Sequence, residues 1–354
     1  MSSTRLMMKS RLLTAYSAMQ AISSSRGIKS EKIYRAFKGN KNLLTIILIV
    51  FALLIEPSAY ADQCTKMSPV MLSTEQLNSF EKDGYLIVRN LFSIEEVSRI
   101  NNCLTRALDK AKAIAEQTQI DENIVIGSAF RCAYEGNNGN SASIKAINNI
   151  DGSVSVQLIS WIGGVEPELI ELARQDKLKV PVSQLLGSSK ADHLINQAHY
   201  KMPFDGVSFP WHQDIQHRRT FDPRWEDLNR RGSFVQVLTA VDRATEENGP
   251  LIVIKGSHRK ELYLEKKQKE AIERIILEEY PNEEWTPILM EPGDTMFMHP
   301  LVLHKSDANQ SHESRMLFVN GFSYPGANKM PYPGSGSAKT IHLLEDTATL
   351  QNLH

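Results

Sequence analysis

The strongest restriction on the fold comes from three side chains that have to meet although the chain separates them widely. His212 and Asp214 stand two residues apart, and His304 follows ninety residues after Asp214. Side chains on an extended segment repeat their direction every two residues, so His212 and Asp214 project to the same side. A histidine from a distant strand would complete a set of two imidazoles and one carboxylate on one face of an octahedral ion. This set is typical of non-haem Fe(II) oxygenases.

The His-x-Asp tripeptide alone is weak, because it arises often by chance and a lone histidine is more often a core or surface residue than a ligand. Arg315, eleven residues after His304, strengthens the pattern. Its planar guanidinium can hold the far carboxylate of a bidentate keto acid such as 2-oxoglutarate. His299 competes with His304 as the distal ligand, but it precedes Pro300 at the end of an expected strand.

Four sequence blocks contain these residues in a fixed order. They are Phe209-Pro210-Trp211-His212-Gln213-Asp214, then Asn248-Gly249-Pro250-Leu251 with Lys255-Gly256-Ser257-His258, then Pro292-Gly293-Asp294, and finally His304-Lys305-Ser306 with Arg315. In identity and order the blocks closely resemble the phytanoyl-CoA dioxygenase family of 2-oxoglutarate enzymes, over roughly residues 70 to 325. The family pattern favours His304 over His299, because of the eleven-residue step to Arg315.

The resemblance implies a mainly β fold with flanking helices, a double-stranded β-helix of the jelly-roll, cupin-like kind. It also implies that His212, Asp214 and His304 bind iron. Arg315, assisted by Ser306, would then bind the 2-oxoglutarate carboxylate.

Two further residues are expected near the cosubstrate. Lys201 ends an expected strand and resembles a position at which the family often has a basic residue beside the cosubstrate pocket. A solvated lysine at the strand end is the alternative. Gln236 lies in an expected strand of residues 233–241, and we expect it to point inward to the cosubstrate.

By this resemblance the chain is an Fe(II)- and 2-oxoglutarate-dependent dioxygenase that consumes O2, hydroxylates a small organic substrate and releases succinate and CO2. Related halogenases have a small residue at the place of Asp214, so the carboxylate favours hydroxylation. Two other classes stay open: a non-catalytic, metal-binding cupin-like protein that binds a ligand, and a zinc hydrolase with the same ligand set. Neither needs Arg315, which therefore favours the dioxygenase.

Three arginines follow the His-x-Asp motif, namely Arg218, Arg219 and Arg224. Guanidinium groups at the mouth of a metal site can receive an anionic or phosphate-bearing substrate. Surface ion pairs with Glu226 and Asp227 are the alternative.

Charge and length limit the possible partners. The chain has 354 residues with 42% hydrophobic content, enough for one large domain with appendages. We expect a basic amino-terminal segment at 1–62, the dioxygenase domain at 68–325 and a tail at 326–354. Residues 1–62 carry nine basic and three acidic side chains, which leaves 31 basic and 38 acidic ones for the rest. Such an acidic body lacks the clustered cations that nucleic acid binding requires, so we expect a small-molecule substrate instead.

An uncharged apolar run at residues 43–55 follows the basic start. It is shorter than the roughly 20 residues of a membrane span but fits a signal-peptide core, and Ala59-Tyr60-Ala61 offers a cleavage site. Export or membrane anchoring is therefore one prediction. The alternatives are an organellar transit peptide, a start downstream of Met1, or a buried or interfacial segment of a cytoplasmic protein. Fe(II) and 2-oxoglutarate are most available in a reducing compartment, which argues against export.

Local patterns predict a few more features. Ser93-x-x-Glu96 is a capping box that opens an amphipathic helix to about Ala115. Polar residues 116–150 are expected to form a mobile surface loop, and the Gly-, Ser- and Pro-rich residues 325–337 to be poorly ordered. Three cysteines without a Cys-x-x-Cys pair indicate neither a disulfide framework nor a zinc site; they are Cys64, Cys103 and Cys132.

Overall fold

The computed structural model describes residues 70–344, apart from 263, 265–268, 282–284, 333 and 335. Its α-helices are α4 (Thr74–Asp83), α5 (Ile94–Asp121), α6 (Glu168–Ala173), α7 (Asp176–Leu186), α8 (Asp214–Phe221) and α9 (Lys269–Glu279). Its strands are β1 (Tyr85–Val88), β2 (Ala129–Glu135), β3 (Ser141–Asn148), β4 (Val154–Ser160), β5 (Lys190–Lys201), β6 (Phe209–His212), β7 (Phe234–Ala240), β8 (Leu251–Ile254), β9 (Trp285–Ile288), β10 (Thr295–Met298), β11 (His304–Ser306), β12 (Arg315–Ser323) and β13 (Lys339–His342).

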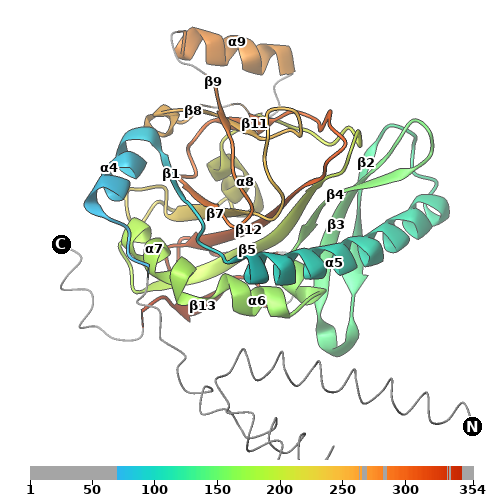
Figure 1. Ribbon diagram of the computed structural model, residues 1–354, viewed down its shortest axis with the longest axis horizontal. Coiled ribbons are helices and arrows are strands. Elements are labelled where there is room, and N and C mark those ends of the chain that lie inside the picture. The colour runs from blue at the N-terminus through green and yellow to red at the C-terminus, as the bar shows by residue number, and fades with distance from the viewer. Residues whose placement is uncertain are drawn as a thin grey trace, which may run out of the picture. The chain divides into compact units, whose positions relative to one another are not determined.

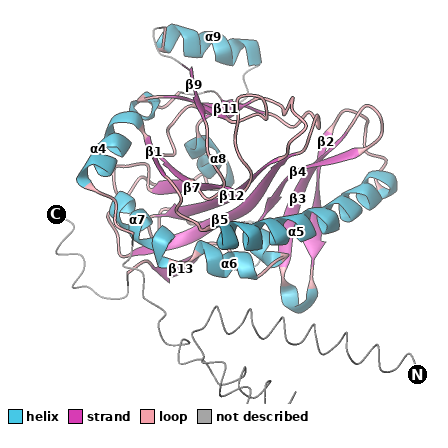
Figure 2. Cartoon of the chain, in the orientation of Figure 1, coloured by secondary structure: helices cyan, strands magenta, loops and turns pink. Residues whose placement is uncertain are grey.

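The strands form two antiparallel sheets. The larger has nine strands, with β1-β10-β7-β12-β5-β4-β3-β2 in order and β13 also paired with β5. The smaller has four strands in the order β6-β11-β8-β9. Figures 1 and 2 show β7, β12 and β5 crossing the middle of the domain, with α5 along one side. The expected mainly β jelly roll with flanking helices is confirmed.

The space between the two sheets is filled by one apolar cluster. Leu238 and Val319 reach it from the larger sheet, and Val253 and Ile288 reach it from the smaller sheet. Fully burying one such side chain contributes roughly 1.5–3 kcal/mol. Other side chains on the same face of these strands therefore also point into the interior of the jelly roll.

Helix α5 covers the outer face of the larger sheet. Ser93 accepts a hydrogen bond from the Glu96 amide, and the Glu96 carboxylate accepts one from the Ser93 amide, so the predicted capping box is present. Ile100 and Leu104 are fully buried against the sheet. The helix continues to Asp121, about one and a half turns beyond the predicted end.

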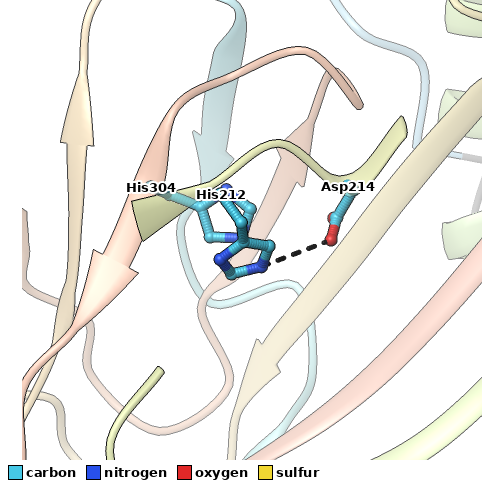
Figure 3. A group of neighbouring side chains, drawn as sticks. All are labelled: His212, Asp214 and His304. Atoms are coloured by element: carbon cyan, nitrogen blue, oxygen red, sulfur yellow. Dashed lines mark ion pairs between the residues drawn. The ribbon is translucent and has the colours of Figure 1, made fainter. Parts of the chain in front are cut away.

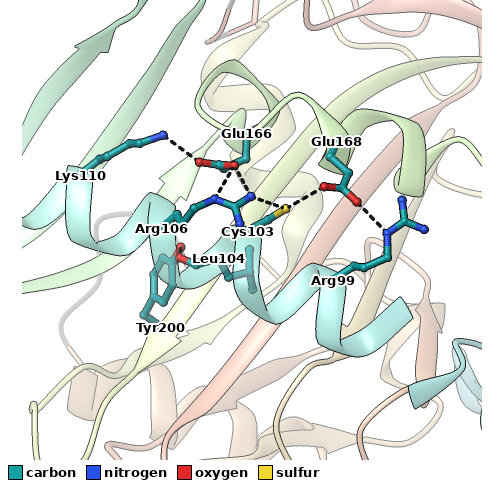
Figure 4. Close-up of polar contacts among 8 residues, drawn as sticks. All are labelled: Arg99, Cys103, Leu104, Arg106, Lys110, Glu166, Glu168 and Tyr200. Atoms are coloured by element: carbon teal, nitrogen blue, oxygen red, sulfur yellow. Dashed lines mark hydrogen bonds and ion pairs between the residues drawn. The ribbon is translucent and has the colours of Figure 1, made fainter. Parts of the chain in front are cut away.

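A polar network fastens α5 to the segment that precedes α6 (Figure 4). Arg106 and Lys110 both donate to the largely buried Glu166 carboxylate, at 2.6 and 2.8 Å. The Tyr200 hydroxyl of β5 donates to the Leu104 carbonyl at 2.9 Å. Burial, followed by nearby Glu168, raises the pKa of the Cys103 thiol to about 11, so this cysteine is an inert part of the network.

The prediction of a mobile surface loop at residues 116–150 is wrong. The segment completes α5 and then forms the β2–β3 hairpin. On β3, Ala142, Ile144 and Ala146 are buried and alternate with half-buried residues, which is the period-two pattern of a strand with one covered face. Small and polar side chains hid this alternation from the sequence reading.

The expected poor order of residues 325–337 is also wrong. As far as this segment is described, it has no helix or strand, but it packs onto the domain. Ala327 is fully buried, and the Lys329 amide donates to the Asp222 carboxylate. Strand β13 follows and pairs with β5.

Within the described residues, no helix combines the length and apolar character that crossing a bilayer requires. The predicted basic segment at 1–62, its apolar run and Cys64 lie outside the described residues, so the predictions made for them remain predictions.

Candidate metal centre

The structure brings the two histidines and the aspartate together inside the domain (Figure 3). Ligand atoms of His212, Asp214 and His304 all lie within 4.8 Å of one another. His304 is the direct antiparallel partner of His212 on the neighbouring strand. Gln213 keeps extended backbone angles, φ −119° and ψ 131°, so the alternation of β6 continues to Asp214, where α8 begins. The sheet thus supplies both imidazoles, and the turn into the helix supplies the carboxylate.

Backbone carbonyls orient both imidazoles in the same way. His212 Nδ1 lies 2.8 Å from the carbonyl oxygen of Pro210, and His304 Nδ1 lies 3.0 Å from that of Val302. A carbonyl only accepts, so each Nδ1 carries the hydrogen and each Nε2 keeps a free lone pair. This second hydrogen bond is what metal-binding histidines usually have.

The aspartate is suited to a cation. Burial alone would raise the pKa of the Asp214 carboxyl, but nearby His304, His212 and Arg218 lower it below its usual value. Its Oδ2 is buried and has no hydrogen-bond partner among the described residues. A buried charged oxygen without a partner is costly, and a divalent metal ion at this point would remove the cost. The residues present therefore fit the iron that the sequence pattern implies.

A buried guanidinium lies at the start of β12. Arg315 is 1% exposed, and its Nη2 donates to the Gly249 carbonyl at 2.8 Å. Its Nε and Nη1 are buried without a partner among the described residues. Burial lowers the pKa of Arg315 to about 10, so the group stays charged at neutral pH. The guanidinium therefore keeps charged donors for a bound carboxylate.

Lys201 lies opposite Arg315 on β5 and is fully buried, so the alternative of a solvated lysine is wrong. Its Nζ donates to the Asp307 carbonyl. Burial and then Arg315 lower the pKa of Lys201 to about 6. Ser306 is buried on β11, two residues after His304. These groups fit the far carboxylate of 2-oxoglutarate.

Gln236 points inward as expected, because its neighbours Phe234 and Leu238 on the same face of β7 belong to the inner cluster. However, Gln236 pairs with Gly321, six residues along β12 from Arg315. Six residues span roughly 20 Å of strand. Gln236 therefore lies far from Arg315 along the strands, and its contact with the cosubstrate remains a prediction.

The rival histidine lies elsewhere. The His299 ring packs between Phe80 and His258, with centroid distances of 6.2 and 5.1 Å. Its Nδ1 accepts a hydrogen bond from the Leu301 amide. The structure thus brings His304, and not His299, to His212.

The sequence reading missed two histidines beside the site. The His199 ring stacks on Phe209 of β6 at 5.2 Å, and the His217 ring lies 5.1 Å from that of His212. Burial, followed by Arg315, lowers the pKa of His199 to about 3, so its ring is neutral. Spacing could have indicated both, since His199 precedes Lys201 by two residues on a strand and His217 follows Asp214 by about one helical turn.

Of the three arginines after the motif, two are engaged away from the metal centre. Arg219 pairs with Glu261, and Arg224 donates to the Lys329 carbonyl at 2.6 Å. The alternative was an ion pair of these arginines with Glu226 or Asp227, but neither acid pairs with Arg219 or Arg224. Arg218 is buried.

The comparisons with known proteins agree with this geometry. The family model described as "Phytanoyl-CoA dioxygenase (PhyH)" matches residues 80–317. The chain belongs to the phytanoyl-CoA dioxygenase family. It is thus a 2-oxoglutarate-dependent non-haem iron dioxygenase, with Fe(II), 2-oxoglutarate and O2 as cofactor and cosubstrates.

Relatives and solved structures give the extent of the likeness. A probable phytanoyl-CoA dioxygenase of Caenorhabditis elegans is 28% identical over 69% of this chain and 73% of that protein. An ectoine dioxygenase of Bordetella bronchiseptica is 28% identical over 53% of this chain, and the match spans only 50% of that protein. The fold resembles that of EctD from S. alaskensis with 2-oxoglutarate and 5-hydroxyectoine, at TM-score 0.54 and 21% identity over 79% of this chain and 89% of that one.

Proposed function

We propose that this family member hydroxylates a small organic substrate and releases succinate and CO2. The observation that carries the proposal is the convergence of His212, Asp214 and His304 within one jelly roll whose interior also holds Arg315, with its Nε and Nη1 unpaired among the described residues. Iron and 2-oxoglutarate, when bound with O2, supply the oxidising power for breaking a C–H bond.

In this proposal each residue of the chain has a separate task. The two imidazoles offer Nε2 to the metal, and their carbonyl contacts keep the rings from turning. Arg315, Ser306 and Lys201 would hold the far carboxylate of 2-oxoglutarate and so orient the cosubstrate. Asp214 occupies the position that halogenases leave free, which supports hydroxylation as the outcome.

The two other classes account less well for the buried groups. A zinc hydrolase or a ligand-binding cupin-like protein can use the three metal ligands. Neither gains from burying Arg315 and Lys201 face to face, an arrangement that is costly unless an anion joins them.

Anaerobic titration with Fe(II) and 2-oxoglutarate tests the proposal. The chelate has a weak visible charge-transfer band, which we expect in the wild type. Arg315→Ala should require at least about tenfold more 2-oxoglutarate, since a charged hydrogen bond contributes roughly 1.5–3 kcal/mol. Arg243→Ala, which removes an exposed pair with Glu291, is the control and should titrate as the wild type does. Absence of the band, or an unchanged titration of Arg315→Ala, would favour the other classes.

A further inference from the structure

A row of directly paired residues crosses the larger sheet toward the metal centre. Arg131 on β2 pairs with Lys145 on β3, which pairs with Leu158 on β4, then His199 on β5 and Leu317 on β12. Directly opposed residues of antiparallel strands lie on the same face of a sheet. Leu317 belongs to the inner cluster and His199 stacks on β6, so this face is the one that looks toward the metal ligands. The hairpin thus presents two cations on the side of the site.

A third cation approaches from α8. Arg218 follows Asp214 by one helical turn and is 5% exposed. Its guanidinium carbon lies 5.0 Å from the ring centroids of both Phe234 and Tyr332. Its Nε and Nη1 are buried and have no hydrogen-bond partner among the described residues. The rings hold the guanidinium in place and leave two donors free.

The Tyr332 ring links Arg218 to the hairpin. The Arg218 guanidinium lies over this ring, and Lys145 is the direct strand partner of Arg131. Burial raises the pKa of the Tyr332 hydroxyl, while nearby Arg218 and Arg131 oppose this rise. The three cations therefore act on one region, the side of the metal centre that Tyr332 lines.

Within the described residues, these three cations form no direct ion pair. Throughout the part of the chain that is described, none of the ion pairs involves Arg131, Lys145 or Arg218. Arg131 has only the Ser143 hydroxyl, at 3.4 Å. Burial and then Arg131 lower the pKa of Lys145. Unpaired positive charges that share a partly buried region repel one another, and a bound anion removes that repulsion.

We propose that Arg131, Lys145 and Arg218 form the receptor for a carboxylate or phosphate group of the substrate, so that the enzyme hydroxylates an organic anion. This receptor is separate from the cosubstrate pocket, because β3 lies three strands from β12, roughly 14 Å from Arg315. The proposal rests on the proposed function and adds the class of substrate.

Lysine-directed aldehydes of matched shape test the receptor without knowledge of the substrate. The Fe(II) protein is kept anaerobic with saturating 2-oxoglutarate, which covers Lys201. It is treated with pyridoxal phosphate or pyridoxal, and in parallel with 4-formylbenzoate or 4-formylbenzamide. Each imine is then trapped with cyanoborohydride, and the labelled lysines are mapped by peptide mass spectrometry. Lys112, exposed on α5, is the internal control.

For each pair, the ratio of labelling by the anionic aldehyde to labelling by the neutral one is measured at Lys145 and at Lys112. We expect this ratio to be about tenfold higher at Lys145 for at least one pair. Preference for pyridoxal phosphate indicates a phosphate, and preference for 4-formylbenzoate indicates a carboxylate. R131Q and R218Q should each reduce the preference. R131Q changes an exposed side chain, so its result can be interpreted even if R218Q does not fold.

Equal labelling of Lys145 by both members of both pairs would overturn the receptor, and so would a preference that R131Q leaves unchanged. The charge-transfer band separates this failure from that of the proposed function. A normal band with no anion preference rejects the receptor alone, whereas a missing band rejects the dioxygenase chemistry whatever the labelling shows.

Discussion

Arg315 and Lys201 lie directly opposite each other on β12 and β5, and both side chains are buried. Each is a cation in its ordinary state, so the pair destabilises the free protein and favours the form with a bound dicarboxylate. Binding strength for the cosubstrate is thus obtained at the expense of stability. Four predictions follow from this pair and from other specific contacts in the domain.

Lys201→Met is expected to stabilise the protein and weaken 2-oxoglutarate binding. Burial and Arg315 lower the pKa of Lys201 to about 6, whereas a lysine in the unfolded chain has a pKa of about 10.4. Between these pH values the unfolded chain binds more protons, so the destabilisation by Lys201 is full at low pH and declines as pH rises. Thermal melts from pH 6 to 9 should show a Tm that rises more steeply in the wild type than in the variant. Parallel curves would contradict this view of Lys201.

His304→Ala should lose iron, and His299→Ala should keep it. His304 pairs with His212 at the centre, while His299 packs against Phe80 and His258. We expect the first variant to bind Fe(II) at least about 100-fold more weakly, measured as metal content after anaerobic dialysis. The second should lower Tm with little change in metal content. The reverse result would move the distal ligand to His299.

Gly249→Ala should reduce the affinity for 2-oxoglutarate more than it reduces the stability of the domain. Gly249 has φ +73° and its carbonyl accepts from Arg315; an added Cβ would lie 2.3 Å from the Asp307 carbonyl oxygen and 3.0 Å from Lys201 Nζ. Gly187→Ala is the matched control, because Gly187 has φ +66° and nothing within 4 Å of an added Cβ. Both variants bear the left-handed backbone strain of roughly 1–2 kcal/mol, but only the first disturbs the carboxylate pocket. Equal 2-oxoglutarate titrations of the two variants would count against that pocket.

Glu166→Gln should destabilise the domain by about 1–3 kcal/mol and leave the cosubstrate titration unchanged. Burial would raise the pKa of Glu166, but Arg106 and Lys110 lower it below its usual value. The contribution to stability is therefore present above the unfolded-state pKa and is lost as pH falls through the folded value. Glu168→Gln removes an exposed pair with Arg99 and should cost at most about 1 kcal/mol. Denaturant unfolding at pH 7 compares the two, and equal losses would show that α5 does not depend on the Glu166 contacts.

The amino-acid sequence by itself determined the features that depend on near neighbours. A capping box opens α5 where Ser93 predicted it; Ser73 opens α4 in the same way, and Gly84 ends α4 in the left-handed conformation. Such signals are local, because a cap or a turn is decided by hydrogen bonds within a few residues. The identity and order of the motifs from His212 to Arg315 also carried the resemblance to the family, and this resemblance implied the jelly roll.

Only the tertiary structure decided which side chains are buried and which charges find partners. The β2–β3 hairpin exists because Ala142, Ile144 and Ala146 have α5 to pack against, a partner that their own segment does not reveal. Gln236 and Lys201 were both expected inward, yet strand register placed only Lys201 beside Arg315. Burial and strand register depend on residues that are far away in the chain, and so does the free energy of each side-chain contact. The residues next to Gln236 and Lys201 in the sequence therefore could not show which of the two lies beside Arg315.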